Sequence, residues 1–266
     1  MRGLLSSQPM IHMLASAAVI GLLSQTPAPP ALPAPPIAPE NPFTHLLPHL
    51  GADLVALPTA QNAGILATGG LFALVFKNNN DARLHTWVLE QKDTSSVASV
   101  GNVIGDGFTQ AGGAVAVWLA GGASQNVRVE TTGANLIRAQ VLNGVLTQGL
   151  KIVAQRDRPD GGSHSFPSGH TSATFATAAV IQHDYGLAAA LPFFALGSFV
   201  GYSRVRSNHH WLSDVAFGAA LGIVAGRAAS HSSPTNWTLV PVKTSGGAAL
   251  YLVRTATSRT LASPWR

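Results

Sequence analysis

The chain has 266 residues, enough for one large domain with a tail, and a formal net charge of +5. Charged residues make up only 10% of it and hydrophobic residues 46%, with 27 glycines, which is typical of closely packed helices in a soluble bundle or near a membrane. The absence of cysteine excludes disulfides and thiolate metal sites, and the ten histidines show no metal-ligand spacing. The excess positive charge lies in residues 132–266 without any basic run, so we expect no nucleic-acid partner.

The N-terminal segment predicts an export signal followed by a linker. Arg2 precedes an apolar run from Met13 to Leu23 that is too short to span a membrane, so residues 1–26 are predicted to be a signal peptide. A short N-terminal membrane anchor is the alternative. Residues 27–42 are rich in proline and predict a stiff linker. The mature protein is therefore expected outside the cytoplasm, in the periplasm or cell envelope, either soluble or membrane-associated.

A helical domain is expected over residues 43–230, followed by a tail over residues 231–266. Apolar periodicity and turn residues predict helices at Ala63–Phe76, Asp81–Gln91, Glu130–Ala154, Gly186–Val200 and Trp211–Ala225, a further one from His170, and a glycine-rich apolar stretch over Val97–Gly122. In the tail, Ser245-Gly246-Gly247 separates two short apolar runs, which predicts a β-hairpin.

The helix predicted at Glu130–Ala154 carries the clearest core-facing stripe. Its small and apolar residues recur at steps of three and four, at Ala139, Leu142, Leu146, Gly149 and Val153. Lys151 lies off this stripe near the end of the helix. Arg158-Pro159 then stops the helix, because a residue before proline is pushed to extended geometry.

Three uncharged stretches are long enough to span a membrane: residues 55–76, 107–127 and 186–203. Each is interrupted by proline, glutamine, asparagine or several glycines. We therefore expect buried helices of a soluble domain in preference to membrane spans.

The segment from Ser165 to His170 predicts a turn that leads into a helix. Pro167 sets the turn, Ser168 and Gly169 supply a small and permissive backbone, and helix-forming residues follow. The free N–H groups at a helix start favour an anion, and a protonated histidine is poorly accommodated there without one. The segment therefore predicts an anion site. The alternative is an ordinary serine cap beside an incidental histidine.

His210 and Asp214 form a second candidate pair. On an α-helix, residues four apart project within about 40° of each other, so the carboxylate can accept from the imidazole Nδ1–H. Nε2 is then left bare, as a histidine that acts as nucleophile or base requires. His209 lies five positions from Asp214, roughly 140° away in projection, and cannot play this part. A surface ion pair is the alternative.

Three cations flank these segments. Lys151, Arg158 and Arg204 each fall at a predicted helix end or an irregular junction, where their side chains can converge. A phosphoryl group carries about two negative charges, and its oxygens suit bidentate binding by arginine. With the backbone N–H groups of Ser168 and Gly169, the cations would surround such a group. Taken alone, each cation is also compatible with a solvated surface charge.

The three segments together resemble the signature of the type 2 phosphatidic acid phosphatase and vanadium haloperoxidase superfamily, in particular its phosphatase branch. The matching positions are Lys151, then Arg158-Pro159 after six residues; Pro167-Ser168-Gly169-His170; and Ser203-Arg204, then His210 after five residues and Asp214 after three more. The resemblance covers roughly residues 131–226. It implies an all-α bundle of the acid phosphatase and haloperoxidase type, and a phosphatase that needs no metal or other cofactor.

The resemblance also implies a role for each matching residue. His210, oriented by Asp214, would attack phosphorus and form a phosphohistidine. His170, protonated while His210 is neutral, would protonate the leaving oxygen and later activate water, which predicts a bell-shaped pH profile. The phosphoryl oxygens would be bound by Lys151, Arg158, Ser168, Gly169 and Arg204.

The implied substrate is a phosphomonoester, either a lipid phosphate or a small soluble ester, and an anionic membrane surface is a candidate partner. A vanadate-dependent haloperoxidase, a membrane lipid pyrophosphate phosphatase and an envelope binding protein are the alternatives. The six-residue spacer after Lys151 favours the phosphatase branch over the haloperoxidase.

Only seven residues, Asp160 to Phe166, connect the first two matching segments, and this connection is short for the family. In or beside this loop, Arg156 and His164 are expected to be solvated rather than to contact a substrate headgroup.

Overall fold

The computed structural model describes residues 42–43, 46–77, 80–91, 95–231, 235–244 and 247–256. The chain divides into two compact units, residues 1–38 and 39–266, and only the second contains described residues. The predicted signal peptide and all of the predicted linker except Pro42 lie outside the described residues, so both stay predictions.

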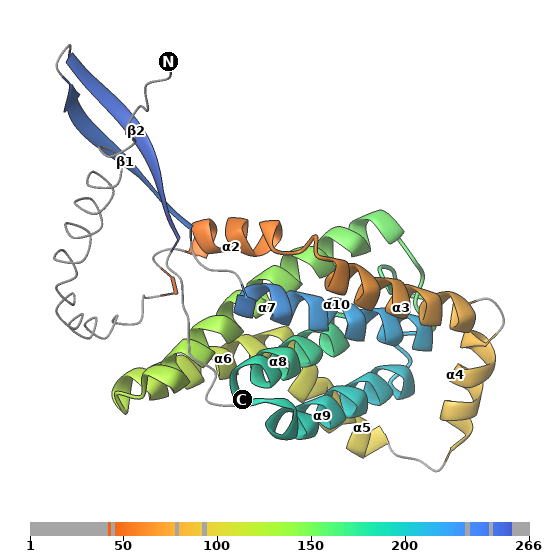
Figure 1. Ribbon diagram of the computed structural model, residues 1–266. Coiled ribbons are helices and arrows are strands. Elements are labelled where there is room, and N and C mark those ends of the chain that lie inside the picture. The colour runs from red at the N-terminus through yellow and green to blue at the C-terminus, as the bar shows by residue number, and fades with distance from the viewer. Residues whose placement is uncertain are drawn as a thin grey trace, which may run out of the picture. The chain divides into compact units, whose positions relative to one another are not determined.

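The described part of the second unit is a bundle of helices, as the all-α prediction requires (Figure 1). Its helices are α2 (Leu46–Val55), α3 (Ala60–Lys77), α4 (Asp81–Glu90), α5 (Ser95–Gly105), α6 (Gly107–Ala123), α7 (Val127–Ala154), α8 (Gly169–Tyr185), α9 (Leu187–Arg206) and α10 (Leu212–His231). Two strands, β1 (Thr235–Thr244) and β2 (Gly247–Ala256), pair antiparallel with Thr244 opposite Gly247.

The longest helix, α7, extends the predicted helix by three residues at its N-terminus. The Asn126 side chain caps that end by accepting from the backbone N–H of Val129 at 3.2 Å. The predicted core stripe is correct for Ala139 and Leu142, which are fully buried, but wrong for Val153, which is 82% exposed. In the C-terminal half of α7, the polar side chains of Asn143, Thr147 and Lys151 line a cavity, whereas Leu142 and Leu146 pack in the hydrophobic core.

Helices α8 and α10 approach so closely that only glycine fits between them. A Cβ placed on Gly222 of α10 would lie 2.1 Å from the carbonyl oxygen of Ser172, and one on Gly218 would lie 2.7 Å from that of Ser168. This close approach places the first turn of α10 against the start of α8, where the N–H of Ser168 donates to the carbonyl oxygen of Asp214 at 3.1 Å. The contact brings together two segments on which the sequence places site residues.

Replacing Gly222 by alanine is therefore expected to destabilise the protein by about 1–3 kcal/mol, because the added methyl group meets backbone that cannot move aside alone. The thermal unfolding midpoint in detergent micelles measures this. Gly149→Ala in α7 is the matched control, since a Cβ there meets nothing within 4 Å. We expect it to be neutral or stabilising, as alanine favours helix over glycine. Equal midpoints for the two variants would contradict the close contact.

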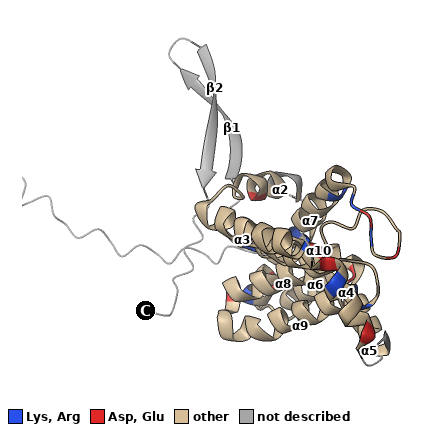
Figure 2. Ribbon diagram, turned by 90° about the vertical axis from the view of Figure 1, so that its right-hand side faces the viewer, with Lys and Arg blue, Asp and Glu red and all other residues tan. Residues whose placement is uncertain are grey.

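Several helices expose large apolar side chains. Two of them, α9 and α10, are long and apolar enough to cross a membrane, and α3 joined to the end of α2 across a bend of 76° would make a third span. On α3, Leu71 is 63% and Phe72 54% exposed. Charged residues are sparse along α3 and α9 in Figure 2. The expectation that residues 55–76 form a buried helix is therefore wrong, because α3 exposes its large apolar side chains.

Candidate active site

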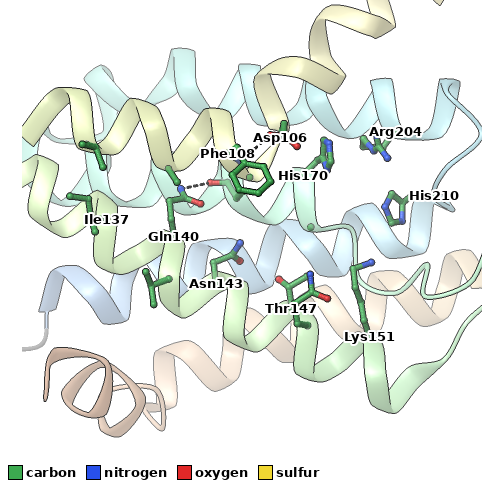
Figure 3. A pocket seen from close by; sticks show the side chains of 18 of the residues that line it. Asp106, Phe108, Ile137, Gln140, Asn143, Thr147, Lys151, His170, Arg204 and His210 are labelled. Atoms are coloured by element: carbon green, nitrogen blue, oxygen red, sulfur yellow. Dashed lines mark hydrogen bonds between the residues drawn. The ribbon is translucent and has the colours of Figure 1, made fainter. Parts of the chain in front are cut away.

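One cavity of about 590 Å³ brings together most of the residues that the sequence predicts for a site. Its lining includes Lys151, Arg158, Gly169, His170, Arg204 and His210. These residues come from the ends of α7, α8 and α9 and from the loops that precede α8 and α10, and four of them converge at one end of the cavity in Figure 3. Within the part of the chain that the structure describes, no group of three or more His, Asp or Glu side chains is placed to hold a metal ion.

Lys151 is held in place by the loop between α7 and α8. Its Nζ donates to the carbonyl oxygen of His164 at 2.6 Å. The loop closes on itself where the N–H of Arg158 donates to the carbonyl oxygen of Gly162 at 2.7 Å. Gly161, with φ of +84°, takes the left-handed conformation that this tight turn needs. The short connection thereby places Lys151 and Arg158 on the same cavity.

The guanidinium groups of Arg158 and Arg204 each have a buried N–H donor without a hydrogen-bond partner among the described residues. Arg204 is only 6% exposed, and its Nη1 donates to Oδ1 of Asn102 at 2.8 Å, which orients the group. The Nε atoms of Arg158 and Arg204 are buried and make no hydrogen bond to any described residue. A buried donor without a partner costs on the order of 1–3 kcal/mol, so two of them beside one cavity indicate that an anion binds there.

Helix α8 begins at Gly169, with Ser168 as its N-cap residue. The Ser168 hydroxyl pairs with Oγ1 of Thr171 at 3.0 Å, and the Ser168 N–H donates to the carbonyl oxygen of Asp214. Ser168 is fully buried and is not among the residues that line the cavity. The predicted phosphate contact through the Ser168 N–H is therefore wrong, because that donor is already engaged. Gly169 lines the cavity at the first helical position, where an N–H has no partner within its own helix.

His210 and Asp214 do meet, but not as neighbours on a helix. His210 precedes α10, and Asp214 lies in its first turn, so the predicted helical spacing is wrong. The chain turns at Trp211, whose N–H donates to Oδ2 of Asp214 at 2.9 Å, and His210 Nδ1 then lies 3.5 Å from the same oxygen. The alternative of a surface ion pair is also wrong, because His210 is 2% exposed and Asp214 is fully buried.

A buried network behind Asp214 was not predicted from the sequence. Arg156 donates through Nη1 to Oδ1 of Asp214 at 2.6 Å and through Nη2 to Oδ2 of Asp81 in α4 at 2.8 Å. Ser165 donates to the other oxygen of Asp214, and Asp81 accepts from the N–H of Ser213 at 3.0 Å. Arg156 is therefore a structural cation inside the network, which corrects its interpretation as a solvated loop residue.

The partners of Arg156, Ser213 and Arg204 could not be predicted from the sequence, because they lie far away along the chain. Asp81 lies 75 residues from Arg156 and 132 from Ser213, and Asn102 lies 102 residues from Arg204. A single polar residue at such a separation leaves no local pattern. For Arg156 the sequence does hold one indication of a role at the site, because Arg156 stands two positions before the predicted site residue Arg158.

Burial lowers the pKa of both site histidines and of Lys151. The pKa of His170 falls from 6.5 to about 4, mainly through burial and secondly through the nearby Arg204 guanidinium. Burial also lowers the pKa of His210 to about 4, although Asp214 stabilises its charged form. Both imidazoles are therefore neutral near pH 7 in the ligand-free protein, and the predicted protonation of His170 requires a bound anion that raises its pKa. Burial and the nearby Arg158 lower the pKa of Lys151 to about 8.

Comparison with known proteins shows that the stretch containing this site is similar to a described family. The family model of the PAP2 superfamily matches residues 132–238, which include Lys151, both site histidines and Asp214. A lipid A 1-phosphatase from Porphyromonas gingivalis is 40% identical over 90 residues, which are 32% of this chain and 20% of that protein. The chain thus spans about a fifth of the length of this curated relative.

Two solved structures are also similar. Aquifex aeolicus LpxE matches with a TM-score of 0.50 and 22% identity, over 57% of this chain and 96% of LpxE. A PAP2-type phosphatidylglycerolphosphate phosphatase from Bacillus subtilis matches with a TM-score of 0.34 and 18% identity, over 71% of this chain and 93% of its own. The likeness to LpxE supports the assignment of the helical fold.

Proposed function

We propose, on the premise that residues 132–238 belong to the PAP2 superfamily, that this chain is a phosphatase that hydrolyses the phosphate monoester of a lipid. That membership confirms the resemblance predicted from the sequence. The observation that carries the proposal is the pair of buried Nε donors on Arg158 and Arg204, which have no partner among the described residues and lie beside two histidines. A phosphoryl group would satisfy both donors and present its phosphorus to His210.

The first chemical step is a transfer of the phosphoryl group to His210. Nε2 of His210 forms a bond to phosphorus while the bond from phosphorus to the ester oxygen breaks. Asp214 accepts from Nδ1–H, which keeps the proton off Nε2 and stabilises the positive charge that develops on the ring. Lys151, Arg158 and Arg204 stabilise the charge on the equatorial oxygens, which phosphoryl transfer chiefly requires.

His170 moves the protons of both steps. Its imidazole is neutral in the ligand-free protein, but a bound phosphoryl dianion favours the charged form and raises its pKa. The imidazolium protonates the departing ester oxygen. The neutral ring then takes a proton from water, whose oxygen attacks phosphorus, and the bond between phosphorus and His210 breaks to release inorganic phosphate.

The rest of the cavity supports a lipid as the leaving group. Beyond the charged end, the cavity is lined by the apolar side chains of Phe43, Phe108, Val115 and Ile137. These suit a hydrocarbon chain, and the membrane-length helices α9 and α10 suit an enzyme that meets its substrate at a bilayer. Placement in the periplasm or cell envelope remains a prediction from the N-terminal sequence.

The test compares phosphate release by the full-length chain from a lipid phosphate in mixed detergent micelles and from a soluble aryl phosphate. We expect a higher kcat/KM for the lipid, and no loss of activity when a chelator is added. Activity that disappears with the chelator and returns with a divalent cation would contradict the metal-independent mechanism. No release from either ester would contradict the function.

Anion binding should weaken as Lys151 loses its proton. Because its pKa is lowered to about 8, the cation is present below that pH and is lost above it. The inhibition constant of an alkyl sulfate, which carries one negative charge throughout this range, is therefore expected to rise between about pH 8 and 10. Lys151→Arg keeps the charge over this range and should remove the rise. A rise that persists in this variant would contradict the role of Lys151.

A further inference from the structure

One polar side chain beside the phosphate end of the cavity has no hydrogen-bond partner among the described residues. Thr147 of α7 is 3% exposed, lines the cavity, and its Oγ1 makes no hydrogen bond to any described residue. A buried helical threonine ordinarily donates to the carbonyl oxygen four residues earlier, as Thr132 of the same helix does to Arg128 at 3.0 Å. A buried hydroxyl without a partner indicates that a ligand group binds there.

Asn143 stands one turn before Thr147 on the same face of α7. It is 4% exposed and also lines the cavity. Its Oδ1 accepts from the hydroxyl of Ser172 in α8, which fixes the orientation of the amide. The Nδ2 donors then make no hydrogen bond within the described part of the chain. Figure 3 shows Asn143 and Thr147 in sequence along α7 toward Lys151.

These two side chains occupy a defined place along the cavity. Thr147 packs beside the start of α8, since its methyl group lies 3.4 Å from the position that a Cβ on Gly169 would take. On the other side, Gln140 is already engaged by the carbonyl oxygen of Ala173 at 3.1 Å and by Thr177 at 3.0 Å. The unsatisfied polar groups therefore lie between the phosphate-binding end and the apolar end.

We propose that Thr147 Oγ1 and Asn143 Nδ2 form a polar subsite for an oxygen substituent on the carbon atoms next to the phosphoester. The matching substrates are lipid phosphates built on a glycerol or sugar unit, whose hydroxyl, ether or ester oxygens lie close to the phosphate. Plain alkyl or isoprenoid phosphates place only hydrocarbon at this position and leave both groups unpaired. This inference rests on the proposed function and names its substrate class.

The test uses two lipid phosphates of equal chain length in the same micelles: a monoacylglycerol phosphate and an alkyl phosphate. For the wild type, we expect kcat/KM to be about 5- to 20-fold higher for the glycerol lipid, the scale of one or two hydrogen bonds. Thr147→Val keeps the shape of the side chain and removes its hydroxyl. It is expected to lose about fivefold on the glycerol lipid and to stay within about twofold on the alkyl phosphate.

Two controls separate binding from folding. Thr147→Ser retains the hydroxyl and should retain the preference for the glycerol lipid. Thr68→Val removes an exposed hydroxyl from α3, away from the cavity, and should behave as the wild type. Equal losses on both lipids in Thr147→Val, or a wild type that does not discriminate, would overturn the subsite while leaving the phosphatase intact. A wild type that hydrolyses neither lipid nor an aryl phosphate would instead overturn the proposed function, and the subsite with it.

Discussion

Replacement of His210 by alanine is expected to lower kcat by about 10³-fold or more, because among the described residues at the cavity only His210 has a carboxylate, that of Asp214, placed to orient its imidazole for attack on phosphorus. His170 cannot substitute for it, since in the described structure the buried Asp214 carboxylate is paired with His210. Steady-state release of phosphate from the lipid and from the aryl ester measures the loss. A brief reaction with radiolabelled substrate, stopped in base, should trap a phosphoenzyme in the wild type and none in the variant.

His209→Ala is the matched control for this variant. His209 is adjacent in sequence, but its Nδ1 bonds the carbonyl oxygen of Ser207 at 2.6 Å and it is not among the residues that line the cavity. We expect its kcat to stay within about threefold of the wild type. A wild-type kcat in His210→Ala, or equal losses of kcat in the two variants, would contradict the assignment of His210 as the nucleophile.

Replacement of Arg156 by methionine is expected to affect both stability and catalysis. The change leaves Asp81, 5% exposed, and Asp214, fully buried, without the cation that they share. Removing one partner from a fully buried ion pair costs about 3–5 kcal/mol, and the 20% exposure of the Arg156 side chain places the expected loss near the lower end. Because Asp214 loses a contact that positions it, kcat should also fall by about 10- to 100-fold.

The thermal midpoint and kcat of the purified variant check this expectation together. Arg83→Met removes an exposed arginine from α4, the helix that carries Asp81, and should change neither quantity by much. Arg156→Lys keeps the charge but cannot bridge two carboxylates with a fork of donors, so partial recovery is expected. If kcat were normal in Arg156→Met while the midpoint fell, the network would be purely structural and Arg156 would not position the catalytic pair.

The sequence by itself determined the chemical identity of the site. Lys151, Arg158, Gly169, Arg204 and the two site histidines all line one cavity because each stands at a helix end or a turn, and turn chemistry is local. Proline and glycine marked those ends within a few residues. The all-α class could also be predicted from the sequence, because the apolar pattern of a helix is local and repeats every three or four residues.

The tertiary structure alone decided how the site is held and what it can accept. Ser168 is engaged by Asp214, and Asp81 shares Arg156 with that carboxylate, through contacts between residues 46 to 75 positions apart. Thr147 is not among the residues of the predicted core stripe of α7, yet packing against α8 buries it beside the phosphate end. Such contacts depend on how closely α8 and α10 approach, which no local period encodes. Residue types thus defined the chemistry, whereas helix packing set which donors remain free for a ligand.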